Sequence, residues 1–197
     1  MCSSDLEKAV LHYRHGTQDH AIHRRRKGWV KSGKGLKRAM ALLPNPQGYK
    51  DPNVHHLSIL DTKGQVRAIL WSMACHPTAF PAQGQLSSDY PGTVRQSWRT
   101  KYQNHLPILF LQGFAGDVRP PAYRSAFSGL NPLLSHLLNG PNFGQFDLKN
   151  YRRWTDSLIR ELSYLEKSTI LELSPDLQIK QSSLKLKNLG LDSEQSM

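Results

Sequence analysis

The segment ILWSMACHPTAF, residues 69–80, combines a nearly continuous apolar run with a polar end. Such a run is typical of a central β-strand that is covered on both faces. It ends at His76, and Pro77 follows directly. Because a buried strand here ends with a titratable side chain, we interpret His76 as a candidate site residue. The alternative is that His76 is a hydrogen-bonded structural histidine.

The segments around this strand predict a small sheet. VHHLSIL and VRAILWSMACH flank DTKGQ, which predicts a hairpin with Gly64 in its turn. A helix is expected from about Pro91, after Asp89, followed by a short buried strand at 107–112. Strand, helix and strand form a β-α-β unit with a right-handed crossover. The fold class expected is therefore α/β, with a mixed sheet and flanking helices.

The remaining segments carry weaker patterns. Asp147 is expected to cap an amphipathic helix over 147–167. At the start of the chain, Ser3 or Ser4 could cap a helix that carries Leu6, Ala9, Val10 and Tyr13 on one face. Residues 125–145 are expected to be loop-like, because Pro and Gly interrupt them. Residues 178–187 predict an exposed or edge strand.

Positive charge is concentrated in one segment. The chain of 197 residues has a formal net charge of +11, and residues 23–38 contain eight Lys and Arg and no acid. No period holds through this segment, which we therefore expect to be a basic loop. An excess of positive charge favours anionic partners, such as phosphate groups, nucleic acid or an anionic membrane surface. Trp29 is the one aromatic residue of the segment that could stack on a base, so the pattern does not favour nucleic acid as the partner. A solvated basic loop is the alternative.

Three polar segments are expected to meet at one sheet edge. The strands that end at His76 and Gln112 should run parallel, and ligands bind at the carboxyl edge of such sheets. The segments are CHPT (75–78), SSD (87–89) and GDVR (116–119). Cys75 is expected to be a buried small apolar residue, because successive side chains of a strand point to opposite faces.

In this order, the segments resemble the neutral/alkaline (non-lysosomal) ceramidase family. The residues that carry the resemblance are ACHPT (74–78), SSDYPG (87–92) and QGFAGDVRP (112–120). Weaker support comes from IHRRR (22–26) with PNPQGYKDPNV (44–54). The resemblance extends over roughly residues 5–185 and implies that residues 1–197 are part of a larger catalytic domain, with a hairpin and β-α-β core at 54–120.

The resemblance implies a zinc-dependent amidohydrolase that cleaves the N-acyl bond of a lipid amide. His76 matches a zinc ligand of the family, while the other ligands have no match in this chain. Asp117 is the candidate catalytic residue, and Ser88, Asp89 and Arg119 are the candidate substrate-binding residues. Arg119 stands where the ceramidases carry serine, and a guanidinium favours a carboxylate or phosphate.

The function expected is thus that of an amidohydrolase fragment that is inactive as an isolated chain. The alternative is a non-catalytic module that binds anions or nucleic acid through the basic loop and Arg119. No apolar run is long enough to predict a transmembrane helix, and the N-terminal residues lack the apolar region of a signal peptide. The compartment stays open.

Overall fold

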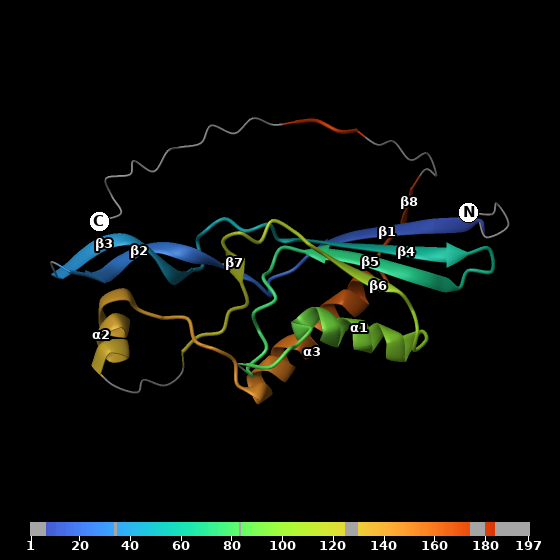
Figure 1. Ribbon diagram of the computed structural model, residues 1–197. Helices are drawn as coiled ribbons and strands as arrows, with labels where there is room; N and C mark the ends of the chain where they lie inside the picture. The colour runs from blue at the N-terminus through green and yellow to red at the C-terminus, as the bar shows by residue number, and fades with distance from the viewer. Residues whose placement is uncertain (1–6, 34, 83, 125–129, 174–179, 184–197) are drawn as a thin grey trace.

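In the computed structural model, residues 7–33, 35–82, 84–124, 130–173 and 180–183 are described. These residues form eight strands in two sheets and three helices, so the expected mixed α/β class is confirmed. The larger sheet has the strand order β6-β5-β4-β1-β8, and the smaller sheet has the order β3-β2-β7. Figure 1 shows the smaller sheet extending from one end of the larger one.

The predicted hairpin and β-α-β unit form the centre of the larger sheet. Strands β4 (Asn53–Asp61) and β5 (Val66–Met73) are antiparallel, and Gly64 adopts a φ of 77° in their turn. After β5 comes α1 (Asp89–Lys101), and then β6 (Ile108–Gln112), which pairs with β5 in parallel. Both the hairpin and the parallel pair are therefore confirmed.

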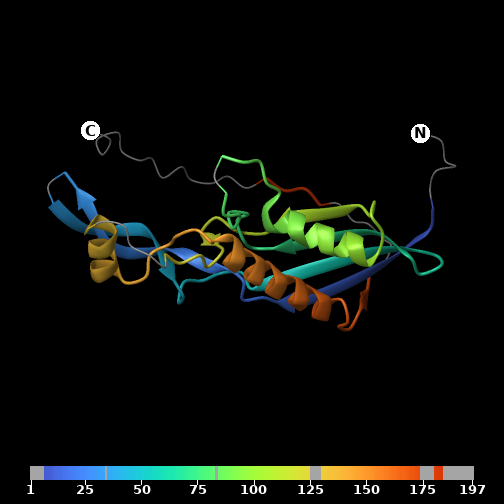
Figure 2. The ribbon, with the colours of Figure 1, turned by 90° about the horizontal axis from the view of Figure 1, so that it is seen from below.

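Two helices cover one face of the larger sheet. Helix α3 (Leu148–Leu165) begins after Asp147, whose side chain accepts the N–H of Asn150 as predicted. In Figures 1 and 2, α1 and α3 lie on the same face of the sheet. Their apolar faces bury a core in which Trp71 packs against the rings of Tyr90, Trp98 and Phe110. This core fixes the end of β5, where the candidate site begins.

The N-terminal helix prediction was wrong for the residues that the structure describes. Residues Ala9–Thr17 form β1, which pairs antiparallel with β4 and also with β8 (Leu171–Glu172). The apolar residues of this segment fit a helical spacing and a strand equally well, and the free edge of β4 decides between them. The proposed caps Ser3 and Ser4 lie outside the described residues, as does most of the strand expected at 178–187.

The expected basic loop at 23–38 was also wrong, because these residues lie in a β-ribbon. Strand β2 (Ile22–Ser32) pairs antiparallel with β3 (Gly35–Asn45), and its first residues pair with β7 (Val118–Arg119). Ladder hydrogen bonds are made by the backbone, so they do not require an alternating side-chain pattern when both faces of a ribbon carry exposed residues. The basic side chains therefore extend from a hairpin.

A helix also lies within residues 125–145, where a loop was expected. Helix α2 (Leu130–Asn139) packs against the β2–β3 ribbon, where Asn139 exchanges two hydrogen bonds with the backbone of Trp29. Pro132 is compatible with this helix because it lies in the first turn, where backbone N–H groups have no intrahelical acceptor. Gly140, with a φ of 69°, follows the last turn.

Candidate functional site

The three polar segments meet at the carboxyl edge of β5 and β6, as the sequence predicts. The backbone N–H of His76 donates to the carbonyl of Val118 at 3.3 Å, which joins CHPT to GDVR. Asp89 joins SSD to the same loop, because one of its carboxylate oxygens accepts the N–H groups of Ala79 and Phe80. The hydroxyl of Tyr90 donates to the carbonyl of Cys75. Thus the core of the molecule holds the segments that carry the candidate residues.

His76 is half-buried and has a polar neighbour at each ring nitrogen. Its Nε2 lies 3.2 Å from Nη2 of Arg24, and its Nδ1 lies 3.0 Å from the side-chain amide of Gln112. A guanidinium can only donate, so Nε2 accepts and the neutral ring carries its proton on Nδ1. The Gln112 side chain accepts a hydrogen bond from Nδ1–H when its amide oxygen and nitrogen exchange places by a rotation of about 180°. Burial, and then the charges of Arg24 and Arg119, lower the pKa of His76.

Arg24 ties β2 to the loop that follows β6. In addition to facing His76, its Nη2 donates to the carbonyl of Gly116 at 2.9 Å, and its backbone N–H donates to that of Asp117. The carboxylate of Asp117 is half exposed and accepts from Nε of Arg25 at 3.2 Å. Asp117 therefore lies at the same edge as His76 but is paired with an arginine.

The candidate residues Ser88 and Asp89 have different surroundings. Asp89 is buried, adopts a positive φ of 50°, and accepts three backbone N–H groups, from Ala79, Phe80 and Tyr90. Ser88 is exposed, and a Cβ added at Gly92 would meet its hydroxyl at 1.8 Å. Asp89 therefore shapes the loop after His76, and Ser88 remains accessible at the start of α1.

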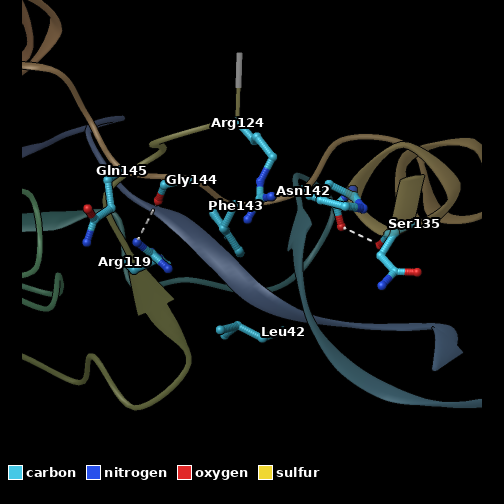
Figure 3. A pocket seen from close by; sticks show the side chains of 10 residues that line it. Leu42, Arg119, Arg124, Ser135, Asn142, Phe143, Gly144 and Gln145 are labelled. Carbon is cyan, nitrogen blue, oxygen red and sulfur yellow. Dashed lines mark hydrogen bonds between the residues drawn. The ribbon is translucent and has the colours of Figure 1, made fainter. Parts of the chain in front are cut away.

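Arg119 is half-buried and lines a pocket. Its guanidinium carbon lies 4.6 Å from the centre of the Phe143 ring, and its Nη2 lies 3.4 Å from the carbonyl oxygen of Gly144. Burial, followed by the charge of Arg24, lowers the pKa of Arg119. Figure 3 shows this side chain at the rim of a pocket that also receives Arg124.

The residues around His76 do not form a zinc site by themselves. Within the described parts of the chain, no three His, Cys, Asp or Glu side chains are grouped closely enough to hold a metal ion. At Nε2 of His76 there is a guanidinium, which is a cation, and at Nδ1 there is an amide. Cys75 is fully buried in the core, where burial raises the pKa of its thiol, as expected of a small apolar residue.

Sequence reasoning missed several residues of this region. Arg24 was assigned to a loop, and Gln112 was noted only as the end of a strand. The pairing of Arg24 with His76 joins residues 52 positions apart, and no local pattern indicates it. No sequence pattern indicated Arg124 or Phe143 as site residues. None of the helices in the described ranges has the length and apolar character needed to span a bilayer.

No protein-family model and no curated protein sequence matches this chain. Among solved structures, the chain is similar to the neutral ceramidase from Pseudomonas aeruginosa, with a TM-score of 0.53, 16% identity and 83% of this chain covered. A ceramidase complexed with C2 gives a TM-score of 0.51 and 17% identity over the same share. The chain spans 23% of the length of each. At this identity, the similarity shows the fold.

Proposed function

We propose that this chain is part of a ceramidase-like hydrolase and contributes one face of a site that cleaves an N-acyl bond. The observation that carries the proposal is the meeting of CHPT, SSD and GDVR at one sheet edge. The fold similarity to two ceramidase structures supports the same assignment. In this proposal the substrate is a lipid amide or a related N-acyl compound.

The proposed roles follow the positions of the side chains. His76 is the metal ligand of the assembled site, and Asp117 lies beside it as the candidate acid–base residue. Ser88, Asp89 and Arg119 form the substrate-binding side, with Asp89 acting through the loop that it shapes. Zinc belongs to this proposal only for a longer protein that supplies the missing ligands, and Arg24 would have to leave Nε2 of His76. No catalytic step through zinc follows from the residues described.

The experiment has two stages. The DNA on both sides of the region that encodes residues 1–197 is sequenced. The protein encoded by the longest open reading frame is then expressed in parallel with the 197-residue chain. We expect a His-x-His motif upstream and further ligands downstream. Hydrolysis of a fluorescent ceramide and of a shorter N-acyl amide is then measured for both proteins, with and without His76→Ala.

We expect activity only in the longer protein, and a loss of at least 100-fold on His76→Ala. A longer protein that carries the missing ligands but cleaves no amide would overturn the proposal. Equal activity with and without His76 would do the same. The absence of such a frame would favour a remnant or a binding module over part of a hydrolase.

The binding module is a second candidate because one observation favours it. Arg119 and Arg124 line a pocket that contains no acidic residue among its described lining. An anion held there requires no catalytic partner. This pocket is considered next.

A further inference from the structure

A pocket of about 890 Å³ lies between β7, the segment 142–145 and α2. Arg119, Arg124, Phe143 and Leu42 are among the residues that line it, and none of the ten lining residues is Asp or Glu. In Figure 3, the guanidinium groups of Arg119 and Arg124 lie on either side of Phe143. The pocket therefore combines two cations with an apolar floor.

Backbone hydrogen bonds hold the walls of this pocket. The N–H of Arg124 donates to the carbonyl of Asn142, and the N–H of Gly144 donates to that of Ala122, each at 2.9 Å. Tyr123 and Phe143 thereby form an antiparallel bridge. A Cβ added at Gly144 would meet the Arg124 backbone at 2.9 Å, so the two segments are in close contact. Arg124 and Phe143 are thus held in place by the backbone.

Among the described residues, no acidic side chain pairs with the guanidinium of Arg119. Within the described ranges, its Nε is buried without a hydrogen-bond partner, and its Nη2 makes a long contact to the carbonyl oxygen of Gly144. No ion pair joins Arg119 or Arg124 to an acid in the part of the chain that the structure describes. The charge of Arg24, which has the same sign, acts on Arg119 and lowers its pKa further. A partly buried cation without a counter-charge is unfavourable, and an anionic ligand would offset part of that desolvation.

We propose that this pocket binds the oxyanion of a small ligand, a carboxylate or a phosphate, between Arg119 and Arg124. The ligand's adjoining apolar part lies against Phe143 and Leu42. Arginine forks suit both oxyanions because they donate two parallel hydrogen bonds to a planar or tetrahedral oxygen pair.

The position of the pocket relates it to the candidate site. Arg119 directly follows Val118, whose carbonyl accepts from the backbone of His76. If the proposed function holds, the anion belongs to the substrate, which is then an N-acyl compound bearing a carboxylate or phosphate. This last step alone rests on the proposed function; binding of the anion does not.

Isothermal titration calorimetry with the 197-residue chain measures whether the pocket binds anionic ligands. The probes are inorganic phosphate, N-octanoylglycine and its neutral counterpart N-octanoylglycinamide. We expect N-octanoylglycine to bind at least 10-fold more tightly than the glycinamide, because only the former carries the carboxylate. Competition by phosphate would show that the bare oxyanion occupies the same place. Tighter binding of phosphate than of acylglycine would identify the source as a phosphate ligand.

Arg119→Gln and Arg124→Gln should each weaken binding about 10-fold or more, since each removes a charge-assisted hydrogen bond. Arg152→Gln, an exposed arginine on α3, is the matched control and should leave affinity unchanged. Circular dichroism checks the fold, and Arg124 is exposed, so its variant should fold even if Arg119→Gln does not. Equal affinity for the glycinamide, or no effect of Arg124→Gln, would overturn the inference.

The outcomes separate this inference from the proposed function. Anion binding by the chain together with a longer protein that cleaves no amide refutes only the hydrolase. Amide hydrolysis by the longer protein, without any anion binding that depends on Arg119 and Arg124, refutes only the anion pocket.

Discussion

Nη2 of Arg24 lies 3.2 Å from Nε2 of His76, so a permanent positive charge faces the ring nitrogen. Arg24 lies on β2 and His76 follows β5, and the carbonyl of Gly116 accepts from the same guanidinium nitrogen. The contact therefore connects the two sheets. The charge of Arg24 disfavours the protonated imidazole, and a donor at Nε2 favours the neutral tautomer with its proton on Nδ1.

Removing the Arg24 charge should raise the pKa of His76. Burial makes the largest contribution to the lowered pKa, and Arg24 and Arg119 follow. Arg24→Gln removes one of these two charges, so the protonated ring becomes less unfavourable. NMR titration of the His76 ring protons measures this change. Lys27→Gln, an exposed change on the same strand, is the control. A pKa that does not move, or that moves down, would contradict the contact.

The 197-residue chain should bind well under one equivalent of zinc tightly. One imidazole that already accepts from an arginine is too few ligands for a stable tetrahedral site. Metal analysis after dialysis measures the content in the parent chain and in His76→Ala. A stoichiometric zinc that His76→Ala removes would show that the chain completes a site of its own.

His56 should make the protein less stable as the pH falls. Burial is the largest cause that lowers the pKa of His56 to about 4. The charge of Glu166, whose carboxylate oxygen lies 4.0 Å from Nε2, raises this pKa by less, and the charges of Arg14 and Lys101 lower it further. The unfolded chain binds a proton near pH 6.5 and the folded chain does not, so stability declines between about pH 6.5 and pH 4. The loss from this residue is at most about 3 kcal/mol.

Urea unfolding at several pH values measures this effect. In His56→Gln the fall in the free energy of unfolding over that interval should be smaller than in the parent. His15→Gln, an exposed histidine on the neighbouring strand, serves as the control. The same slope in His56→Gln and in the parent would refute the assignment.

Asp89→Asn should destabilise the protein by about 2–4 kcal/mol, because a buried acceptor of several N–H groups is expensive to replace. The carboxylate accepts from Ala79 and Phe80 through one oxygen and from Tyr90 through the other, whereas asparagine presents an NH₂ group to one of these sets. Thermal or urea unfolding gives the value, and the exposed Asp156→Asn on α3 is the control. A change below 0.5 kcal/mol would mean that the loop after His76 does not depend on Asp89.

Nucleic-acid binding by the β2–β3 ribbon should be weak and strongly dependent on salt. The exposed side chains of Lys27, Lys31 and Lys37 can neutralise phosphates, and each neutralised phosphate releases counterions. Fluorescence anisotropy with a DNA duplex at 50 and 200 mM salt measures this, and Lys27→Gln with Lys31→Gln should reduce the salt slope. Salt-resistant, sequence-selective binding would instead favour a nucleic-acid-binding module.

Local sequence patterns predicted the elements whose partners lie nearby in the chain. The apolar run at 69–75, the turn with Gly64 and the cap at Asp147 each specify an element from residues adjacent in the chain. The parallel pairing of β5 with β6 also followed, because a strand, a helix and a strand have one favoured crossover. Hence the edge where His76, Asp89 and Asp117 gather could be predicted before the structure was known.

Elements that depend on distant partners could not be predicted in this way. β1 is a strand because β4, some forty residues later, offers it an edge, and the basic segment is a ribbon because β2 pairs with both β3 and β7. The tertiary structure alone brings Arg24 to His76 and Arg119 to Phe143. Sequence therefore determined which polar segments reach the site. Packing between remote strands decided which charges face them, because electrostatic contacts depend on distances that no local pattern encodes.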